Sequence, residues 1–367
     1  MSTIYVPSGG DIQSGISKIR PSDRLVIGPG IFEQWLVPGS IPSGVPGSPT
    51  VIAAEIPGTV VIRPPVGGGS GGLTTGPIRY VAFDSIITDA ANVPDAAWEL
   101  TGSDLVLLNC EGRNAHTVYG SGFMFIGSRI LLQDCVSESC GDLGGLGAAH
   151  GAYVSTSDNV IQGFKVLNHR DGYGVQIYNS AGNCNRNRVF QLYVGPSGGS
   201  KAGAIVSSGQ GHVLSDFLIE GCNGGVYVQY GAFGALVGPG TVRNCRGVAV
   251  AVRDAVDTVI DRVQRYGNGS NEIENSGTNT VIIEGPLPEP GPVPPDPIPP
   301  DPGPGPGPVP PEKKTKKTKI KMSIQVEATI TERWTNLPPE TPEESSLQSS
   351  IRRDLPPEIL LTTPKPS

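Results

Sequence analysis

Three short stretches of this chain carry most of the side chains that could perform acid–base or electrostatic chemistry. His150 opens "HGAYVSTS", the trio His169, Arg170 and Asp171 precedes "GYGVQIYNS", and Lys201 precedes "GAIVSSG". Removing the proton α to the carboxylate of a uronate sugar needs a base, and it needs a cation that neutralises the carboxylate while charge develops. We interpret His150 as a candidate base, and Arg170 or Lys201 as the candidate cation.

Two alternatives to this assignment stay open. Tyr153, if its pKa is lowered, is another candidate base in the same stretch. Hydrolysis of a glycosidic bond would instead need two carboxylates roughly 5–10 Å apart, and Asp171 is the only carboxylate well placed here, so hydrolysis fits less well. The competing interpretation is that "NHRDG" is an ordinary polar turn, in which the Asp171 carboxylate bonds its own backbone.

A repeated phrase explains why these stretches belong together. Its copies are "GFMFIGS", "GAYVSTS", "GVQIYNS", "GAIVSSG", "GVYVQYG" and "GVAVAVR", and they begin at 122, 151, 174, 203, 225 and 247, which are 22 to 29 residues apart. A second series of short apolar stretches, such as "LVLLNC" and "ILLQDC", interleaves with the first. Each unit therefore holds two or three strands of four to six residues, with Gly, Asn, Asp or Ser at the corners.

Units of this size predict a solenoid of short parallel strands, an all-β, right-handed parallel β-helix of about nine or ten coils. A propeller blade would need ~40 residues, and a leucine-rich repeat would show its own leucine pattern, which is absent. Stacked strands lie ~4.8 Å apart, so the five chemical side chains would lie within about 10–15 Å of one another. The leading glycine of each copy is expected to let the backbone turn a corner at little steric cost.

Alternation along the strands divides inner from outer side chains. Val175, Ile177, Val226 and Val228 are expected inside the core. The expected outer positions are Met124 and Ile126, Tyr153 and Ser155, Gln176 and Tyr178, Ile205 and Ser207, Tyr227 and Gln229, and Ala249 and Ala251.

The outer positions form a stripe that carries no charge before Arg253. Aromatic rings can stack on sugar rings, and amides can bond sugar hydroxyls. We therefore interpret five of these residues as candidate substrate contacts: Tyr153, Gln176, Tyr178, Tyr227 and Gln229. The alternative is that tyrosine and glutamine are simply favourable residues on an exposed strand.

Three stretches resemble the pectate-lyase-like superfamily of right-handed parallel β-helix proteins. They are "IYVPSGGDIQSGISKIRPSDRLVIGPGIFEQ", similar to the family's opening strand, capping helix and first coil, "SGVPGSPTVIAAEIPGTVVIRPP", and the "HGAYVSTSDNVIQGFKVLNH" repeats. The resemblance covers nearly all of residues 1–285. It implies the fold, but that superfamily includes polysaccharide lyases, hydrolases, uronan epimerases, phage tailspikes and proteins with no known activity. No stretch matches the catalytic signature of one enzyme family, so no catalytic residues are carried over.

Six cysteines lack any C-x-x-C pair, which argues against a zinc site. Four of them, Cys110, Cys135, Cys222 and Cys245, recur at one place in their units, so we expect buried free thiols and no disulfides. Asp134, Glu138 and Asp142 could offer oxygen ligands to calcium, but a solvated turn is the simpler interpretation. No cofactor is otherwise implied.

Composition divides the chain into an N-terminal cap with first coils (1–75), β-helix repeats (76–285), a linker (286–321) and a tail (322–367). Residues 286–311 hold fifteen prolines and favour polyproline II, and a lysine-rich run follows. The tail begins with the alternating "MSIQVEATITERW", which could form one strand or a hairpin arm, and its remainder is expected to be disordered.

The net charge of −7 provides no basic face for nucleic acid, and no apolar run is long enough to span a membrane. The opening "MSTIYVPSGGDIQSG" lacks the features of a signal peptide, which leaves a cytoplasmic protein, export by another route or a mature form. Of these we expect an extracellular or virion location. The expected partner is a polysaccharide, recognised with or without uronate lyase or epimerase activity; the alternative is a structural or adhesive fibre protein.

Overall fold

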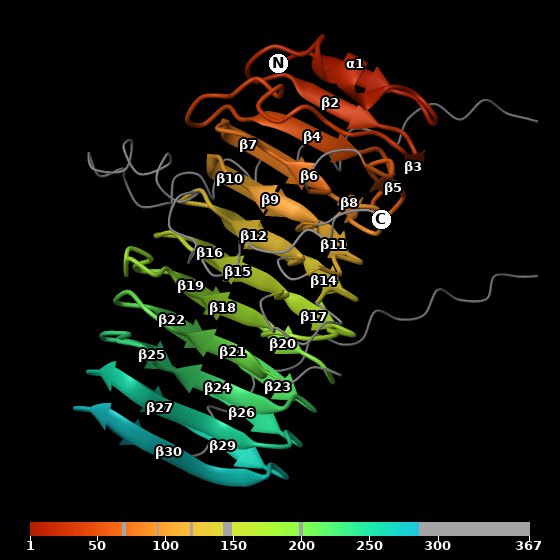
Figure 1. The fold of residues 1–367 in the computed structure, drawn as a ribbon. Coiled ribbons are helices and arrows are strands. Elements are labelled where there is room, and N and C mark those ends of the chain that lie inside the picture. The colour runs from red at the N-terminus through yellow and green to blue at the C-terminus, as the bar shows by residue number, and fades with distance from the viewer. Residues whose placement is uncertain (68–70, 94, 118–119, 142–148, 198–200, 286–367) are drawn as a thin grey trace, which may run out of the picture.

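The computed structural model describes residues 1–67, 71–93, 95–117, 120–141, 149–197 and 201–285, and it shows a parallel β-helix (Figure 1). Each complete coil contributes one strand to each of three long sheets, and the strands inside the stack pair with their counterparts in the coils before and after them. The helix has about 11 turns, more than the nine or ten expected. The predicted linker and tail lie outside the described residues.

Sheet 1 has 12 strands and begins at the N-terminus. Its strands are β1 (Thr3–Val6), β2 (Arg24–Ile27), β4 (Thr50–Ala54), β7 (Arg79–Asp84), β10 (Ser103–Leu108), β13 (Leu131–Gln133), β16 (Val160–Gln162), β19 (Arg188–Phe190), β22 (Val213–Ser215), β25 (Leu236–Val237), β28 (Val259–Asp261) and β31 (Val281–Ile283).

Sheet 2 has ten strands and follows sheet 1 in each coil. Its strands are β3 (Gly30–Phe32), β5 (Val60–Ile62), β8 (Ile86–Asp89), β11 (Glu111–Arg113), β14 (Val136–Glu138), β17 (Lys165–Leu167), β20 (Tyr193–Val194), β23 (Phe217–Glu220), β26 (Gly240–Arg243) and β29 (Val263–Tyr266).

Sheet 3 has nine strands and contains the repeated phrase. Its strands are β6 (Leu73–Thr74), β9 (Trp98–Leu100), β12 (Phe123–Phe125), β15 (Ala152–Val154), β18 (Val175–Ile177), β21 (Ala202–Val206), β24 (Gly224–Val228), β27 (Val248–Val256) and β30 (Ser270–Thr278).

A short helix covers the N-terminal end of the coil stack. Helix α1 (Ile12–Ile16) begins at Asp11, whose carboxylate accepts a hydrogen bond from the backbone N–H of Ser14 at 3.1 Å. Ile12 and Ile16 are fully buried against the first coil. The order of strand, capping helix and first coil that the sequence predicted is therefore confirmed.

The interior is built from columns of stacked apolar side chains. Val175, Ile177, Val226 and Val228 are buried, as the alternation predicted. Trp98 stacks on the ring of Phe123 one coil later, with ring centroids 6.2 Å apart and an interplanar angle of 6°. In-register stacking therefore places like residues on like residues.

The leading glycines of the repeated phrase form a column, but not because the backbone turns a corner there, as the sequence analysis expected. Gly151, Gly174 and Gly203 do not adopt positive φ. A Cβ on Gly174 would lie 2.5 Å from the carbonyl oxygen of Gly203 and 2.7 Å from a methyl of Val194 in sheet 2. Close packing between sheets 2 and 3, rather than backbone freedom, excludes side chains from this column.

Backbone freedom is needed at other corners, where non-glycine residues take positive φ. Asn109 and Asp134 lie in successive coils between sheets 1 and 2, with φ of 51° and 52°, and Gly163 follows them in the next coil. Asn and Asp tolerate this left-handed conformation better than other residues with side chains. The Asn and Asp residues of the interleaved motifs are therefore corner residues.

All six cysteines are buried and free, including Cys110, Cys135, Cys222 and Cys245, for which the repeated positions predicted it. Burial raises the pKa of the Cys140 thiol to about 11, which keeps it protonated and unreactive at neutral pH. These thiols act as small apolar side chains of the core.

We expect Val226→Asp to lower the free energy of unfolding by about 3–5 kcal/mol, because it buries an unpaired charge among stacked apolar residues. Urea denaturation followed by circular dichroism measures the change. Leu236→Asp is the control, since Leu236 is 37% exposed on the outside of sheet 1, and it should cost no more than about 1 kcal/mol. Equal losses in the two variants would contradict the assignment of inner and outer positions.

Candidate functional site

The candidate chemical residues meet where the chain enters sheet 3. The His150 ring lies between two tyrosines, with its centroid 5.6 Å from that of Tyr153 and 5.5 Å from that of Tyr173. The Nζ of Lys201 lies 5.9 Å from the centroid of the Tyr173 ring, within the range of a cation–π contact. The structure thus gathers an imidazole, two phenols and an ammonium at one corner of three successive coils.

The geometry of His150 does not fit the role of a base. Its Nδ1 accepts a hydrogen bond from the backbone N–H of Tyr173 at 3.1 Å, which places the ring proton of the neutral form on Nε2. The side chain is only 2% exposed. Burial, together with the nearby His169 and Lys201, lowers the pKa of His150 to about 3. The ring is neutral near pH 7, and its one basic lone pair is already bonded.

Tyr153 does not fit the role of a base either. Burial raises the pKa of its phenol to about 12, and the neighbouring Tyr178 contributes to the rise. The expectation of a lowered Tyr153 pKa is therefore wrong, because no cation in the described chain offsets the loss of hydration. Tyr173, which the sequence analysis did not single out, has a pKa that burial likewise raises to about 12.

The charged and titratable residues of the "NHRDG" turn lie in two places: His169 and Asp171 lie near His150, and Arg170 lies near Cys140. His169 and Asp171 are buried, and the Asp171 charge acts on both His150 and His169. Burial lowers the pKa of His169 to about 4. Arg170 instead lies where its charge acts on the Cys140 thiol, and its backbone N–H donates to the Cys140 carbonyl at 2.8 Å. Arg170 is thus placed beside the stacked cysteine, and Lys201 is the better placed of the two candidate cations.

The predicted tyrosine stripe lies on the outer face of sheet 3, called here the sheet 3 face. Strand register places Tyr153, Gln176, Ile205 and Tyr227 in one column of four successive coils. Tyr178 lies in the adjacent column, one coil after Ser155. The three tyrosines are half-buried, so they share one outer face with their rings partly exposed.

Several positions that the alternation placed outside are buried. The buried ones are Ile205, Ser207, Ala249 and Ala251, and also Ser155 and Gln229 at 6% exposure. The Ser155 hydroxyl donates to the Phe125 carbonyl of the preceding coil at 2.8 Å, which withdraws it from the surface. Gln229 is consequently a poorer candidate contact than Gln176, which is half-buried.

The last copy of the repeated phrase is aligned two residues from its expected register. Val226 pairs with Val250 rather than Val248, so Ala249 occupies the glycine column. The shift brings Arg253 into the column of Gln229, inside the stripe rather than beyond it. The sequence predicted Gly247 of "GVAVAVR" in the glycine column. The prediction is wrong by two residues, because Ala249 also fits the column in this coil.

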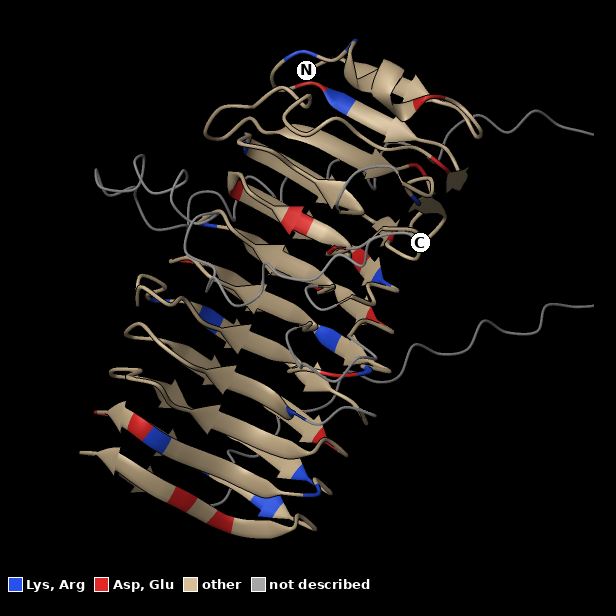
Figure 2. Cartoon of the chain, in the orientation of Figure 1, with Lys and Arg blue, Asp and Glu red and all other residues tan. Residues whose placement is uncertain are grey.

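Arg253 adds a second cation to the sheet 3 face. Its Cζ lies 5.3 Å from the centroid of the Tyr227 ring, and its guanidinium donates two hydrogen bonds, of 2.8 and 2.7 Å, to the Glu274 carboxylate. Strands β12, β15, β18, β21 and β24 carry no charged residue, and charge appears on the face at β9, β27 and β30 (Figure 2). Lys201 and Arg253 therefore flank an otherwise uncharged aromatic surface.

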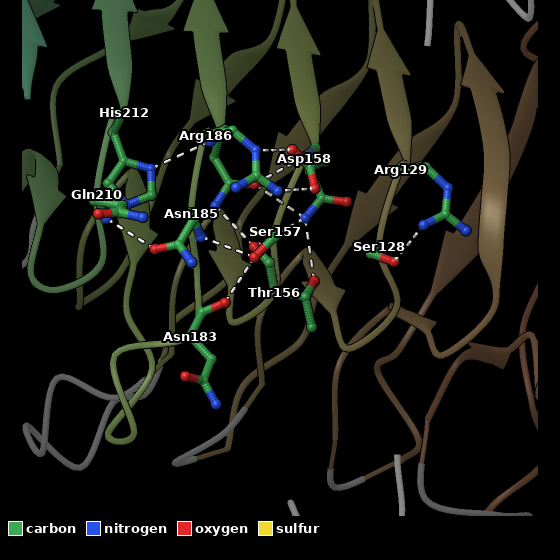
Figure 3. A network of polar contacts seen from close by, with 12 residues as sticks. Ser128, Arg129, Thr156, Ser157, Asp158, Asn183, Asn185, Arg186, Gln210 and His212 are labelled. Atoms are coloured by element: carbon green, nitrogen blue, oxygen red, sulfur yellow. Dashed lines mark hydrogen bonds and ion pairs between the residues drawn. The ribbon is translucent and has the colours of Figure 1, made fainter. Parts of the chain in front are cut away.

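Polar side chains at the opposite end of the sheet 3 strands form a structural ladder (Figure 3). The backbone N–H of Asn185 donates to the Ser157 hydroxyl at 2.9 Å, and that hydroxyl donates to the Asn183 carbonyl at 2.7 Å. Arg186 holds the Asp158 carboxylate with two hydrogen bonds of 2.7 and 2.6 Å. These groups join one coil to the next.

The fourth histidine of the chain, His212, belongs to this ladder. Its Nδ1 accepts from the backbone N–H of Asn187 at 3.2 Å, and its Nε2 bonds the Ser208 carbonyl at 2.9 Å. The Asn187 side chain oxygen in turn accepts from the backbone N–H of Asn159 at 2.9 Å. Because both ring nitrogens are bonded inside the coil stack, His212 is a structural histidine.

The proposed calcium ligands are not assembled by the described chain. The Asp134 carboxylate accepts a hydrogen bond from Gln133, its neighbour, and the Glu138 carboxylate accepts one from Asn168 in the next coil. Asp142 lies outside the described residues. Within the described ranges, no three His, Cys, Asp or Glu side chains are grouped closely enough to hold a metal ion.

No family model and no curated protein matches the sequence. Within the described residues, no helix is long and apolar enough to cross a membrane. The structure matches other parallel β-helices, at sequence identities too low to carry residue roles from them to this chain.

Three of the matching structures are an alginate lyase, an epimerase module and a phage tailspike. The alginate lyase from Paenibacillus sp. str. FPU-7 is 13% identical, with 77% of this chain and 98% of that one covered at a TM-score of 0.40. The A-module of Azotobacter vinelandii mannuronan C-5 epimerase AlgE6 is 11% identical, with 71% and 91% covered at 0.37. The tailspike protein of E. coli bacteriophage HK620 is 13% identical, with 76% and 60% covered at 0.35.

We expect the two buried histidines at this corner to make the fold acid-sensitive. Their folded pKa values of about 3 and about 4 lie below the usual 6.5, so the unfolded chain binds more protons below pH 6.5 and stability falls as the pH falls toward 4. The loss is about 1.4 kcal/mol per pH unit for each histidine. Urea denaturation at a series of pH values measures it.

His150→Gln and His169→Gln should each flatten this pH dependence. His116→Gln is the control, because the His116 ring is exposed, and its profile should follow that of the unmodified protein. One histidine contributes roughly 1.4 kcal/mol per pH unit to the slope of the unfolding free energy between pH 6.5 and pH 4.5. The assignment of His150 as a buried neutral ring is wrong if His150→Gln leaves that slope unchanged.

Proposed function

We propose that the sheet 3 face binds an acidic polysaccharide, with the chain laid across successive coils. The observation that carries the proposal is the flanking of half-buried tyrosines by two cations, Lys201 and Arg253, each held over a tyrosine ring. Tyrosine rings offer apolar faces to the C–H groups of a sugar. Lys201 offers charge-assisted hydrogen bonds to a sugar carboxylate, and Arg253, whose Nε and Nη2 are bonded to Glu274, has its Nη1 left to do so.

The dimensions of the face suit an extended oligosaccharide rather than a small ligand. Tyr153 and Tyr227 lie in one column three coils apart, which is roughly 14 Å at the spacing of stacked strands. Gln176 lies between them in the same column and supplies amide groups for sugar hydroxyls. The face therefore offers a row of separate contacts along the coil stack, as the extended binding surfaces of solenoid proteins do.

The described residues support binding of the polysaccharide without its chemical conversion. Proton abstraction at neutral pH needs a base with a free lone pair and a pKa near the operating pH. His150 has its lone pair bonded, and the phenols of Tyr153 and Tyr173 have raised pKa values. An adhesive or structural role on a polysaccharide-rich surface follows, and lyase or epimerase activity is the competing outcome.

Lyase activity is tested directly by incubating the protein with a panel of uronate polymers. Ultraviolet absorbance follows the unsaturated products of lyase cleavage, and proton NMR follows inversion of the sugar carbon by an epimerase. Binding without either change supports the adhesive form of the proposal. Product that disappears in His150→Gln would instead restore His150 as the base.

Tyr178→Ala should weaken binding of an acidic oligosaccharide about ten- to hundredfold, because a stacked phenol contributes roughly 1–3 kcal/mol at a binding surface. Isothermal titration calorimetry measures the dissociation constant. Tyr266→Ala is the matched control, because Tyr266 is an exposed tyrosine of sheet 2 that is 47% accessible. A tenfold loss in the control, or none in Tyr178→Ala, would move the binding surface away from sheet 3.

Lys201→Gln should weaken binding of the acidic oligosaccharide and leave a neutral oligosaccharide of the same length unaffected. The reason is that the ammonium contributes through charge, so the loss should also shrink as salt concentration rises. Lys165→Gln, at an exposed lysine of sheet 2, is the control. Titrations at low and high salt give the comparison, and equal losses for acidic and neutral ligands would refute selection of carboxylates by this cation.

A further inference from the structure

The two ends of the coil stack differ. At the N-terminal end, α1 covers the core with buried Ile12 and Ile16. At the C-terminal end, the last strands are β31, β29 and β30, and within the described residues no strand pairs with their outer edges. The backbone groups along these edges remain available for another strand, which is a hazard that natural sheets normally cover.

The exposed end is apolar. Leu214, Val237, Ile260 and Ile282 form one column of sheet 1, and the first three are at most 2% exposed. Ile282 is 40% exposed, because within the described residues no coil follows it. Val281 and Ile283, in the outer columns of Val259 and Asp261, are 52% and 44% exposed. Within the part of the chain that the structure describes, the end of the core column is thus uncovered, whereas solenoids need a terminal cap.

The last coil also carries a net negative charge. Residues 259–285 contain four carboxylates, Asp261, Glu272, Glu274 and Glu284, against Arg262 and Arg265. Glu274 pairs with Arg253 and Glu284 pairs with Arg265, so Glu272 is the glutamate of this coil best placed to meet a further cation. Two of these glutamates lie on β30, which Figure 2 shows at the end of the stack. A covering segment should therefore combine apolar side chains with positive charge.

The chain itself contains such a segment beyond the described residues. Residues 322–331, "MSIQVEATIT", alternate apolar and polar positions with the period of a strand, and their ten residues match the nine of β30. Six lysines lie just before them, between 313 and 321. The 27 residues from 286 to 312 could span roughly 80 Å at the rise of polyproline II, far more than the width of one coil.

We propose that residues 322–331 of the same chain cap the C-terminal end of the β-helix. The segment adds a strand along the open edge of β30, and Met322, Ile324, Val326, Ala328 and Ile330 cover the exposed end of the core. The preceding lysines face Glu272 of the last coil, since Glu274 and Glu284 are paired with Arg253 and Arg265. Tethering by the linker raises the effective concentration of the segment, which favours the chain's own strand over one from a second copy.

Hydrogen–deuterium exchange of the full-length protein tests the cap. Ile324→Asp with Val326→Asp places charge on the apolar side of the segment, and Ser323→Asp with Gln325→Asp places the same charge on the polar side. The first pair should accelerate exchange of amides in 270–283 at least about tenfold, and the second pair should not. Amides of β15 and β18, far from the end, serve as the reference for an intact fold.

Three results would overturn the proposal. Exchange of 270–283 at the rate of unprotected amides in the unmodified protein would show that nothing covers the end. Equal exchange in the unmodified protein and the Ile324→Asp, Val326→Asp variant would show that this segment is not the cap. Protection that increases with protein concentration would assign the end to a second copy of the chain.

Discussion

In-register stacking of parallel strands is the constraint on which the rest of the structure depends. Each residue lies directly over its counterpart one coil away, so the residue at one position limits what its neighbours in the column can be. The glycine column shows this most clearly, because a Cβ on Gly174 would meet both the carbonyl of the next coil and a methyl of sheet 2. The buried cysteines and the stacked Trp98 and Phe123 follow the same rule.

The same constraint shapes the candidate site. His150 is held at the corner because the backbone N–H of the next coil bonds its ring, and this bond occupies the nitrogen that a base would use. Stacking also places Tyr153 and Tyr227 in one column three coils apart. It places Lys201 over the ring of Tyr173 and Arg253 over the ring of Tyr227. A surface produced in this way suits repeated contacts with a polymer better than a single reacting centre.

The fold could be predicted from the sequence because the repeat is visible in the glycine, the alternating apolar residues and the corner residues. The inner positions Val175 and Val226 and the sharing of one face by Tyr153, Tyr178 and Tyr227 were predicted correctly for this reason. The protonation of His150 and Tyr153 could not be predicted, since it depends on burial and on hydrogen bonds between coils. Tyr173 was missed because the repeated phrase was aligned from Gly174 onward, and Arg253 because alanine replaces glycine in the last copy.

A crystal structure of the protein with a bound acidic oligosaccharide would test the central claim most directly. The account predicts sugar rings over Tyr153, Tyr178 and Tyr227, with carboxylates within hydrogen-bonding distance of Lys201 or Arg253. An oligosaccharide bound on sheet 1 or sheet 2, or one on the sheet 3 face whose carboxylates avoid both cations, would contradict it.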